Sequence, residues 1–265
     1  MTDGELLDLA RTVAEEAAVL VRERRAAGVE VADTKSSPVD VVTEADRAAE
    51  ELIYSRLTRA RPGDGFLGEE GGSAESSSGV TWVVDPIDGT VNFLYGIPQY
   101  AVSIAASRDG EVVAGVVVNV ATREVFAATR GGGATVDGRP LRVRDVVPLE
   151  QRLVATGFNY VADVRRLQAA AVGRMLSTVR DIRRLGSAAL DLCAVAAGRL
   201  DGFVEEGLNP WDMAAGGLVA TEAGARLETR PGVGGTTCVV AGPEAGFDDF
   251  VALVEDCGFF ATAGE

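Results

Sequence analysis

Hydrophobic residues change their spacing along this 265-residue chain, and the change divides it into two halves. Apolar side chains in residues 5–27 recur every three or four positions, which predicts an amphipathic helix ending at Gly28. From Tyr100 to Val143, short β-rich runs are separated by turn sequences such as RDG, RGGG and VDGRP. That pattern predicts an antiparallel meander. The first half is therefore expected to be of the α+β class.

The second half alternates between two patterns. Helical spacing occurs at 163–179, 187–199, 211–223 and 247–257. Short strand-like runs lie between these segments, in LVATGF, DGFVEE, ARLETR and TTCVVAG. Such alternation favours a layered α/β arrangement. We expect an N-terminal α+β subdomain, residues 1–146, and a C-terminal α/β subdomain, residues 147–265, that completes the functional site.

The composition excludes several classes of function. The chain contains no histidine, which rules out Ser-His-Asp and Cys-His catalysis and histidine-ligated zinc or iron. Its net charge is −15, so no basic surplus exists for binding nucleic acid. Acid–base chemistry would have to come from carboxylates, hydroxyls or metal-bound water.

The chain also lacks the patterns of membrane and secreted proteins. Its longest apolar runs are well short of the roughly 20 residues that a membrane span needs. The start, DGELLDLA, is acidic where a signal peptide needs positive charge. The cysteines Cys193, Cys238 and Cys257 are scattered and are expected to be reduced, mostly buried thiols. We expect a soluble, cytoplasmic protein.

Acidic residues stand out at four places in the sequence. They are Glu69-Glu70 in GEEG, Asp85 and Asp88 in DPIDGT, Asp212 in NPWDMAAG, and Asp46 in TEAD. Each has an ordinary explanation. A surface loop accounts for GEEG, which belongs to a predicted turn followed by a Ser/Gly-rich loop. Helix capping accounts for Asp212 and for Asp46, which lies three positions after the predicted cap Thr43 of a helix running to about Arg59.

The DPIDGT segment is explained least well by a turn alone. The apolar strand VTWVV delivers two carboxylates, Asp85 and Asp88, to one edge of the fold. Two close carboxylates repel each other unless a cation lies between them, and Mg²⁺ is the cation that oxygen ligands favour. The carbonyl of Ile87 could add a neutral ligand. The backbone N–H groups of Gly89 and Thr90 could face a phosphate.

Taken together, GEE, WVVDPIDGTVNF and WDMAAG resemble the inositol monophosphatase family in order and spacing, as do KSSPVDVVTEAD and GSAALDLCAVAAGRLDGFVEE. The resemblance covers nearly the whole chain. It implies a Mg²⁺-dependent, lithium-sensitive phosphatase with two or three ions per subunit, usually a homodimer. It also implies an αβαβα layered sandwich of the inositol monophosphatase and fructose-1,6-bisphosphatase type.

The resemblance implies a role for each motif residue. The metal ligands would be Glu69, Asp85, Ile87, Asp88 and Asp212, with Glu70 in support. The residues that orient the attacking water would be Asp46 and Thr90, next to the metal ligand Glu69. The residues that contact the substrate would be Asp88, Gly89, Thr90, Ala188, Glu205 and Asp212.

Several alternatives remain open at this stage. The substrate is expected to be a small phosphorylated polyol, namely myo-inositol monophosphate. Histidinol phosphate, fructose 1,6-bisphosphate or a 3′-phosphonucleotide are alternatives, and a non-catalytic, metal-binding regulatory role is another. Asn209-Pro210 stand where some relatives carry other residues, which bears on substrate preference. The single lysine, Lys35, is either a solvated loop residue or a loop contact near the site.

Overall fold

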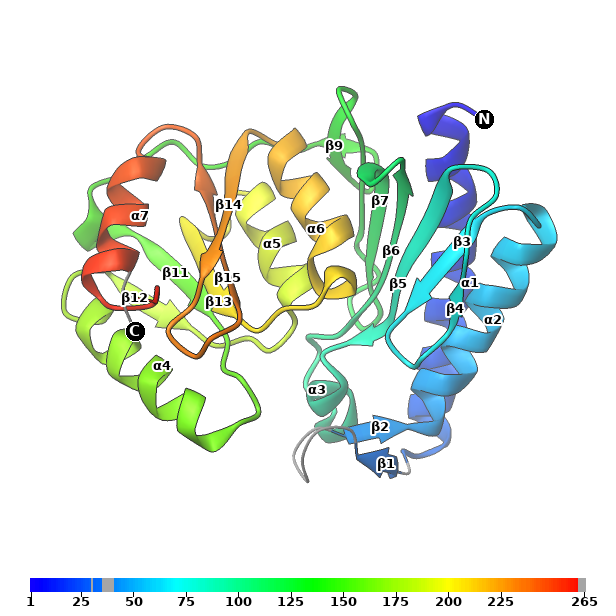
Figure 1. The fold of residues 1–265 in the computed structure, drawn as a ribbon, viewed down its shortest axis with the longest axis horizontal. Coiled ribbons are helices and arrows are strands. Elements are labelled where there is room, and N and C mark those ends of the chain that lie inside the picture. The colour runs from blue at the N-terminus through cyan, green and yellow to red at the C-terminus, as the bar shows by residue number, and fades with distance from the viewer. Residues whose placement is uncertain (30, 35–40, 262–265) are drawn as a thin grey trace.

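A computed structural model of the chain describes residues 1–29, 31–34 and 41–261. Its elements form five layers in the order helices, sheet, helices, sheet, helices (Figure 1). This is the αβαβα arrangement that the resemblance implies, so the predicted fold class is confirmed. Lys35 and most of the Ser-Pro loop around it lie outside the described residues.

The first layer consists of two helices, α1 (Asp3–Ala27) and α2 (Glu44–Ala60). Both begin with a capping box, in which the Thr2 or Thr43 side chain accepts a backbone N–H and an acidic side chain returns the bond. Helix α1 packs against α2 and against the first sheet (Figure 1). The predicted cap at Thr43 and the helix end at Gly28 are therefore confirmed.

The second layer is an eight-stranded sheet in the order β10-β9-β8-β7-β6-β5-β3-β4. Its strands are β3 (Gly65–Gly68), β4 (Ser73–Ala74), β5 (Val80–Asp88), β6 (Ala101–Arg108), β7 (Glu111–Asn119), β8 (Val125–Thr129), β9 (Gly133–Val136) and β10 (Arg139–Pro140). Strands β5 to β10 pair antiparallel with their neighbours in sequence, which confirms the predicted meander. Among the described strands of this sheet, β3 and β5 form the one parallel pair.

Strand β5 carries the DPIDGT segment into the middle of the molecule. Its pairing with β6 shifts between Asp85 and Asp88, so the last residues of the strand leave the regular ladder. Gly89 then adopts a left-handed conformation, with φ of 91°, and caps the short helix α3 (Thr90–Tyr95). The irregular strand end lets Asp85 and Asp88 face the same space, which a regular alternation would not.

The central layer contains α5 (Ala188–Ala196) and α6 (Pro210–Glu222), which lie between the two sheets (Figure 1). Small residues let α6 approach the first sheet. A Cβ at Gly115 of β7 would lie 3.0 Å from the Cα of Ala215 in α6. This close packing places the start of α6, with Asp212, beside the end of β5.

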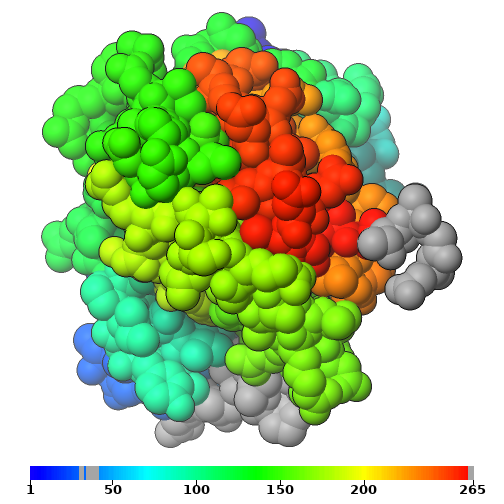
Figure 2. Space-filling model, turned by 90° about the vertical axis from the view of Figure 1, so that its left-hand side faces the viewer, coloured from blue at the N-terminus to red at the C-terminus, as the bar shows by residue number. Residues whose placement is uncertain are grey.

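The second sheet and the outer helices complete the fold. The sheet has the order β12-β11-β13-β15-β14, with β11 (Leu153–Thr156), β12 (Asp181–Arg183), β13 (Gly202–Glu206), β14 (Ala225–Pro231) and β15 (Thr237–Pro243). Helices α4 (Ala162–Met175) and α7 (Phe247–Asp256) lie side by side on its outer face, lime green and red in Figure 2. Met175 and Phe250 belong to one buried cluster beneath them.

The structure departs from the sequence expectations in a few places. Residues 65–68 were expected in a turn, but they form β3, since they pair with Thr81 to Val84 of β5. Helices α4 and α5 end at Met175 and Ala196, earlier than the patterns indicated. Several short elements were not anticipated, namely β1 (Val31–Thr34), β2 (Val41–Thr43), β4, α3, β12 and the 3₁₀ turn η1 (Leu149–Gln151).

The cysteines, the absence of a membrane span and the subdomain boundary were also predicted from the sequence. All three cysteines are free and buried, as predicted. Within the described ranges, no helix is both long and apolar enough to cross a bilayer. The first sheet ends at Pro140 and the second begins at Leu153, while the division into subdomains at residues 146 and 147 stays a prediction.

Candidate metal and phosphate site

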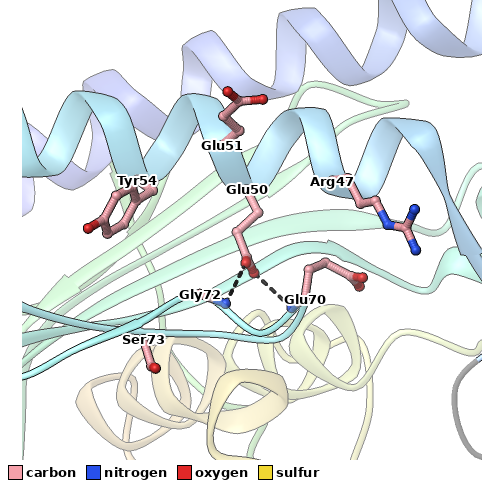
Figure 3. Close-up of a pocket in the computed structure, with 7 residues that line it drawn as sticks. All are labelled: Arg47, Glu50, Glu51, Tyr54, Glu70, Gly72 and Ser73. Carbon is pink, nitrogen blue, oxygen red and sulfur yellow. Dashed lines mark hydrogen bonds between the residues drawn. The ribbon is translucent and has the colours of Figure 1, made fainter.

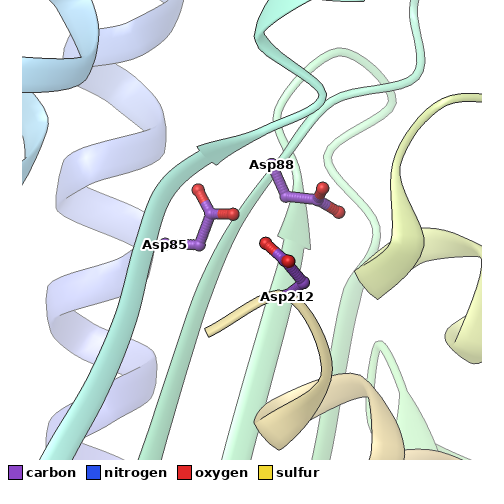
Figure 4. Close-up of side chains that lie close together, drawn as sticks. All are labelled: Asp85, Asp88 and Asp212. Atoms are coloured by element: carbon purple, nitrogen blue, oxygen red, sulfur yellow. The ribbon is translucent and has the colours of Figure 1, made fainter. Parts of the chain in front are cut away.

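Three aspartates from two distant segments converge at the end of β5 (Figure 4). Oxygen atoms of Asp85, Asp88 and Asp212 all lie within 4.8 Å of one another. Asp85 is 1% exposed and Asp88 is 8% exposed, so both carboxylates are largely removed from water. Opposite ligands of a single Mg²⁺ lie about 4.2 Å apart, so the spacing suits one or more small cations.

The backbone orients each of these carboxylates through one oxygen. Asp85 Oδ1 accepts the N–H of Ile87 at 2.9 Å, and Asp212 Oδ2 accepts the N–H of Asn209 at 2.6 Å. Asp88 Oδ2 accepts the N–H of Ala189 at 2.8 Å, at the first turn of α5. These bonds fix the direction in which each carboxylate points. The capping role expected for Asp212 and its role in the acidic cluster therefore coexist.

Burial and the mutual repulsion of the carboxylates determine the pKa values in the acidic cluster. Burial raises the pKa of Asp85 well above its usual range, and the charges around it, that of Glu69 first, raise it further. Burial and then the charge of Asp88 raise the pKa of Asp212 in the same way. Burial raises the pKa of Asp88 to about 6. A hydrogen bond from Ser187 lowers this pKa and so limits the rise. Without a cation, the folded protein would hold these groups partly protonated.

Thr90 and Asp46 form a hydrogen-bonded pair beside the cluster. The Thr90 hydroxyl lies 3.1 Å from Asp46 Oδ1 and 3.0 Å from the carbonyl oxygen of Ile87. The other Asp46 oxygen accepts the N–H of Thr43 at 2.9 Å, as part of the capping box of α2. Burial raises the pKa of Asp46 to about 7, against the lowering effect of the bonds from Thr43.

The two glutamates of GEEG face different spaces. Glu69 lines the large cavity together with the three aspartates, and its charge acts on Asp85. Glu70 lines a separate, smaller cavity beside α2 (Figure 3). The expected metal ligand and its expected supporting residue therefore lie in different places. Glu69 lines the large cavity with the acidic cluster, and Glu70 lines the small cavity beside α2.

The large cavity has a volume of about 670 Å³. It contains nearly all the residues that the resemblance assigns to metal or substrate, with Asp46 reached through Thr90. Those that line it are Glu69, Asp85, Ile87, Asp88, Gly89, Thr90, Ala188, Glu205 and Asp212.

Glu205 and Arg184 mark the end of the cavity formed by the second sheet. Burial raises the pKa of Glu205 to about 7, while the positive charge of Arg184 opposes the shift. The same guanidinium lowers the pKa of Asp88. Arg184 therefore supplies positive charge to a cavity that also contains several carboxylates, and Arg165 is a second arginine in its lining.

Sequence reasoning missed several residues of this site. Arg184 lies outside the acidic motifs and precedes GSAALDL, so no local pattern in the sequence marks it. Ser187 donates to Asp88 at 2.5 Å and also caps α5, so the preference of serine for helix starts could have identified it. Asp191 on α5 does not line the cavity, but it is buried, and its Oδ1 has no hydrogen-bond partner among the described residues.

The donor set fits a hard divalent cation. All the side-chain donors at the cluster are carboxylate oxygens, and a thiolate or imidazole donor is absent from the lining residues. Burial first, and then the charges of neighbouring carboxylates, raise the pKa of Asp85 and of Asp212, and a bound cation would offset both effects. Mg²⁺ prefers such oxygen ligands, so the residues present are suited to hold it.

Comparison with known proteins identifies the architecture. The family model described as "Inositol monophosphatase family" matches residues 3–252. The protein named Inositol-1-monophosphatase SuhB from Mycobacterium tuberculosis is 49% identical over 265 residues, covering 93% of this chain and 91% of that protein. The solved structure of Mycobacterium tuberculosis SuhB superposes with a TM-score of 0.85 at 44% identity, covering 98% of this chain and 99% of that one.

A further relative carries a different kind of name. The Pseudomonas aeruginosa protein called "Nus factor SuhB" is 43% identical over 201 residues, which is 70% of each chain. Similarity across this group therefore extends to a protein named as a factor and not as an enzyme.

Proposed function

The chain belongs to the inositol monophosphatase family of phosphatases, and from this we propose that it hydrolyses myo-inositol monophosphate to inositol and phosphate with Mg²⁺. One observation carries the proposal. Carboxylate oxygens of the buried Asp85 and Asp88 and of the half-buried Asp212 lie within 4.8 Å of one another, in the cavity that Thr90 also lines. The proposed metal ligands and Thr90, which would orient water with Asp46, thus line one cavity that could hold a phosphorylated sugar.

The proposed metal ligands come from three segments of the chain. Glu69, Asp85 and the carbonyl of Ile87 would hold a first ion, and Asp88 and Asp212 would hold a second together with Asp85. A third, weaker ion would lie beside Glu69. When bound, Mg²⁺ supplies positive charge to the phosphoryl oxygens and lowers the pKa of a water molecule.

The Thr90–Asp46 pair would orient that water and take its proton. The Thr90 hydroxyl donates to Asp46, so its oxygen is left to accept a hydrogen bond from water. As the water oxygen attacks phosphorus, its proton would pass through Thr90 to Asp46. The bond from phosphorus to the sugar oxygen would break, and the leaving oxygen would take a proton from a water molecule to become the alcohol. A base is most effective when its pKa lies near the working pH, and the pKa of Asp46 is about 7.

The remaining cavity residues would bind the substrate. The backbone N–H groups of Gly89 and Thr90 lie at the cavity wall, where they would face the phosphate. Ala188 and Glu205 would contact the sugar ring, with Glu205 accepting hydrogen bonds from its hydroxyls. The charge of Arg184 would favour an anionic substrate at that end of the cavity.

The same chemistry could act on another small phosphate ester. Histidinol phosphate, fructose 1,6-bisphosphate and a 3′-phosphonucleotide remain alternatives within the proposal. A homodimer, a cytoplasmic location and inhibition by Li⁺ are further parts of it, all implied by the resemblance to the family.

A non-catalytic role is the second candidate. The name of the Pseudomonas aeruginosa relative favours it, because that name denotes a factor. The intact set of carboxylates argues for catalysis, since a purely regulatory protein has no need for buried, mutually repelling groups.

Phosphate release separates the two candidates. We expect the wild-type protein to release phosphate from myo-inositol 1-phosphate with Mg²⁺, faster than from the alternative esters, and to be inhibited by Li⁺. Asp85→Asn should lose both turnover and thermal stabilisation by Mg²⁺. The matched control is Asp256→Asn, at an exposed position at the end of α7. If the wild-type protein released phosphate from none of these esters, the non-catalytic role would be favoured.

A further inference from the structure

Glu50 binds the turn that carries Glu69, and it lies at the smaller cavity beside α2 (Figure 3). It lies on α2 one turn after Asp46 and is 7% exposed. Its Oε2 accepts the N–H of Glu70 at 2.8 Å, and its Oε1 accepts the N–H of Gly72 at 2.9 Å. A single buried carboxylate thus holds two main-chain groups of the same turn.

The glycines of GEEGG make this approach possible. A Cβ at Gly68 would overlap the carboxylate of Glu50, and a Cβ at Gly72 would lie 2.8 Å from its Oε1. The N–H of Gly68 donates to the carbonyl of Gly72 at 2.8 Å, which closes the turn. The turn is therefore shaped around the Glu50 carboxylate.

Glu69 lies inside this turn, and its side chain faces the opposite way. It lines the large cavity, whereas Glu50 and Glu70 line the small one. Its own N–H donates to the carbonyl of Val84 on β5 at 3.2 Å. The turn is thus attached to β5 on one side and to Glu50 on the other, with Glu69 between the two attachments.

We propose that Glu50 is a positioning residue for the metal site, whose carboxylate fixes the turn of residues 68–72 so that Glu69 reaches the bound ion. This inference rests on the proposed role of Glu69 as a metal ligand. Groups behind the direct ligands commonly set how well those ligands bind, and their loss typically costs about 10- to 100-fold in metal affinity. Helix α2 would then serve the site twice, through Asp46 and through Glu50.

The test compares Glu50→Gln with the wild-type protein by titration calorimetry with Mg²⁺. An amide keeps one acceptor oxygen but sets an NH₂ group against a backbone N–H, so the turn loses one attachment. We expect the Mg²⁺ affinity to fall by about 10-fold or more. In phosphate release, the Mg²⁺ concentration for half-maximal rate should rise by the same factor, and kcat at saturating Mg²⁺ should change far less. Glu51→Gln, at the exposed neighbouring position on α2, should leave both quantities unchanged.

A double-mutant cycle tests whether Glu50 acts through Glu69. In a Glu69→Gln background, Glu50→Gln should weaken Mg²⁺ binding no further, because the ligand that it positions is already altered. Should Glu50→Gln fail to fold, Gly72→Ala must show the same loss of affinity, since its Cβ presses on the same carboxylate oxygen.

Each other outcome decides the question. The inference is overturned if Glu50→Gln lowers thermal stability without Mg²⁺ but binds Mg²⁺ like the wild type. It is also overturned if the effects of the two glutamates add, or if the wild-type protein binds no Mg²⁺. If the wild type binds Mg²⁺ but releases no phosphate, the proposed function fails, while weakened binding by Glu50→Gln would still support the positioning role.

Discussion

The hydroxyl oxygen of Thr90 lies 3.1 Å from Asp46 Oδ1, although the two residues are 44 positions apart in the chain. Asp46 belongs to the first turn of the outer helix α2, and Thr90 begins the short helix after β5. The contact joins the first helical layer to the acidic cluster. It also gives the cavity a hydroxyl group that is oriented by a buried carboxylate.

Replacing Thr90 by valine should remove this hydroxyl while keeping the shape of the side chain. We expect the rate of phosphate release to fall by about 10²- to 10⁴-fold, the range of a lost general acid–base contact. Thermal stabilisation by Mg²⁺ should persist, because the three aspartates are unchanged. Steady-state kinetics and thermal unfolding with and without Mg²⁺ measure the two effects.

The control for Thr90→Val is Thr12→Val, on the outer face of α1, where the hydroxyl only bonds the carbonyl of Asp8. It should leave turnover unchanged. A parallel loss of rate and of Mg²⁺ stabilisation in Thr90→Val would mean that Thr90 supports the structure of the site and takes no part in catalysis.

The metal-free protein should lose stability as the pH rises. The folded pKa values of Asp46 and Glu205 are about 7 and that of Asp88 is about 6, all above the usual range near 4. Between these limits the folded state binds more protons than the unfolded state. The resulting stabilisation is fully present below about pH 4 and is lost as the pH rises through about 6 to 7.

Thermal unfolding in EDTA should therefore give a midpoint that falls between about pH 5 and about pH 8. Mg²⁺ should oppose the fall, because it neutralises the ionised carboxylates. Asp46→Asn should make the fall shallower, since one titrating group is removed. A metal-free midpoint that rises across this interval would contradict the described environment of these carboxylates.

Glu205→Gln should reduce selectivity more than chemistry. Hydrogen bonds to a charged group contribute about 1.5–3 kcal/mol, so KM for myo-inositol 1-phosphate should rise by roughly 10-fold or more. KM for p-nitrophenyl phosphate, which lacks sugar hydroxyls, should change little. Glu244→Gln, at an exposed position after β15, is the matched control. Equal changes for both substrates would remove Glu205 from ring recognition.

Gly89→Ala should destabilise the fold more than Gly110→Ala. Both glycines have positive φ, 91° and 87°, which costs a side-chain-bearing residue about 1–3 kcal/mol. A Cβ at Gly89 would also lie 2.9 Å from the carbonyl oxygen of Gln99 and 3.0 Å from that of Gly186, whereas Gly110 has nothing within 4 Å. Urea unfolding measures the difference. Equal losses would show that the space around Gly89 can adjust.

The sequence predicted best those features that depend on neighbouring residues. The cap at Thr43 and the antiparallel meander are local, because each depends on residues a few positions apart. Strand β3 was missed because its pairing with β5 spans the Ser/Gly-rich loop, which no local pattern reveals.

The candidate site shows the same limit. The motif residues were identified by resemblance, and the structure brings Asp85, Asp88 and Asp212 together. The hydrogen bond from Ser187 to Asp88 joins residues 99 positions apart in the chain. In the sequence, Glu50 is one of several glutamates on a predicted helix, and nothing distinguishes it from the others. Such contacts are set by how layers pack, so they emerge only from the three-dimensional arrangement.

The most direct test of the account is anomalous diffraction from crystals of the wild-type protein soaked in Mn²⁺, which shares the oxygen ligands of Mg²⁺. The account predicts strong peaks at bonding distance from carboxylate oxygens of Asp85, Asp88 and Asp212, with Glu69 beside one of them. Crystals of protein that is active with Mn²⁺ but shows no peak among these carboxylates would contradict it.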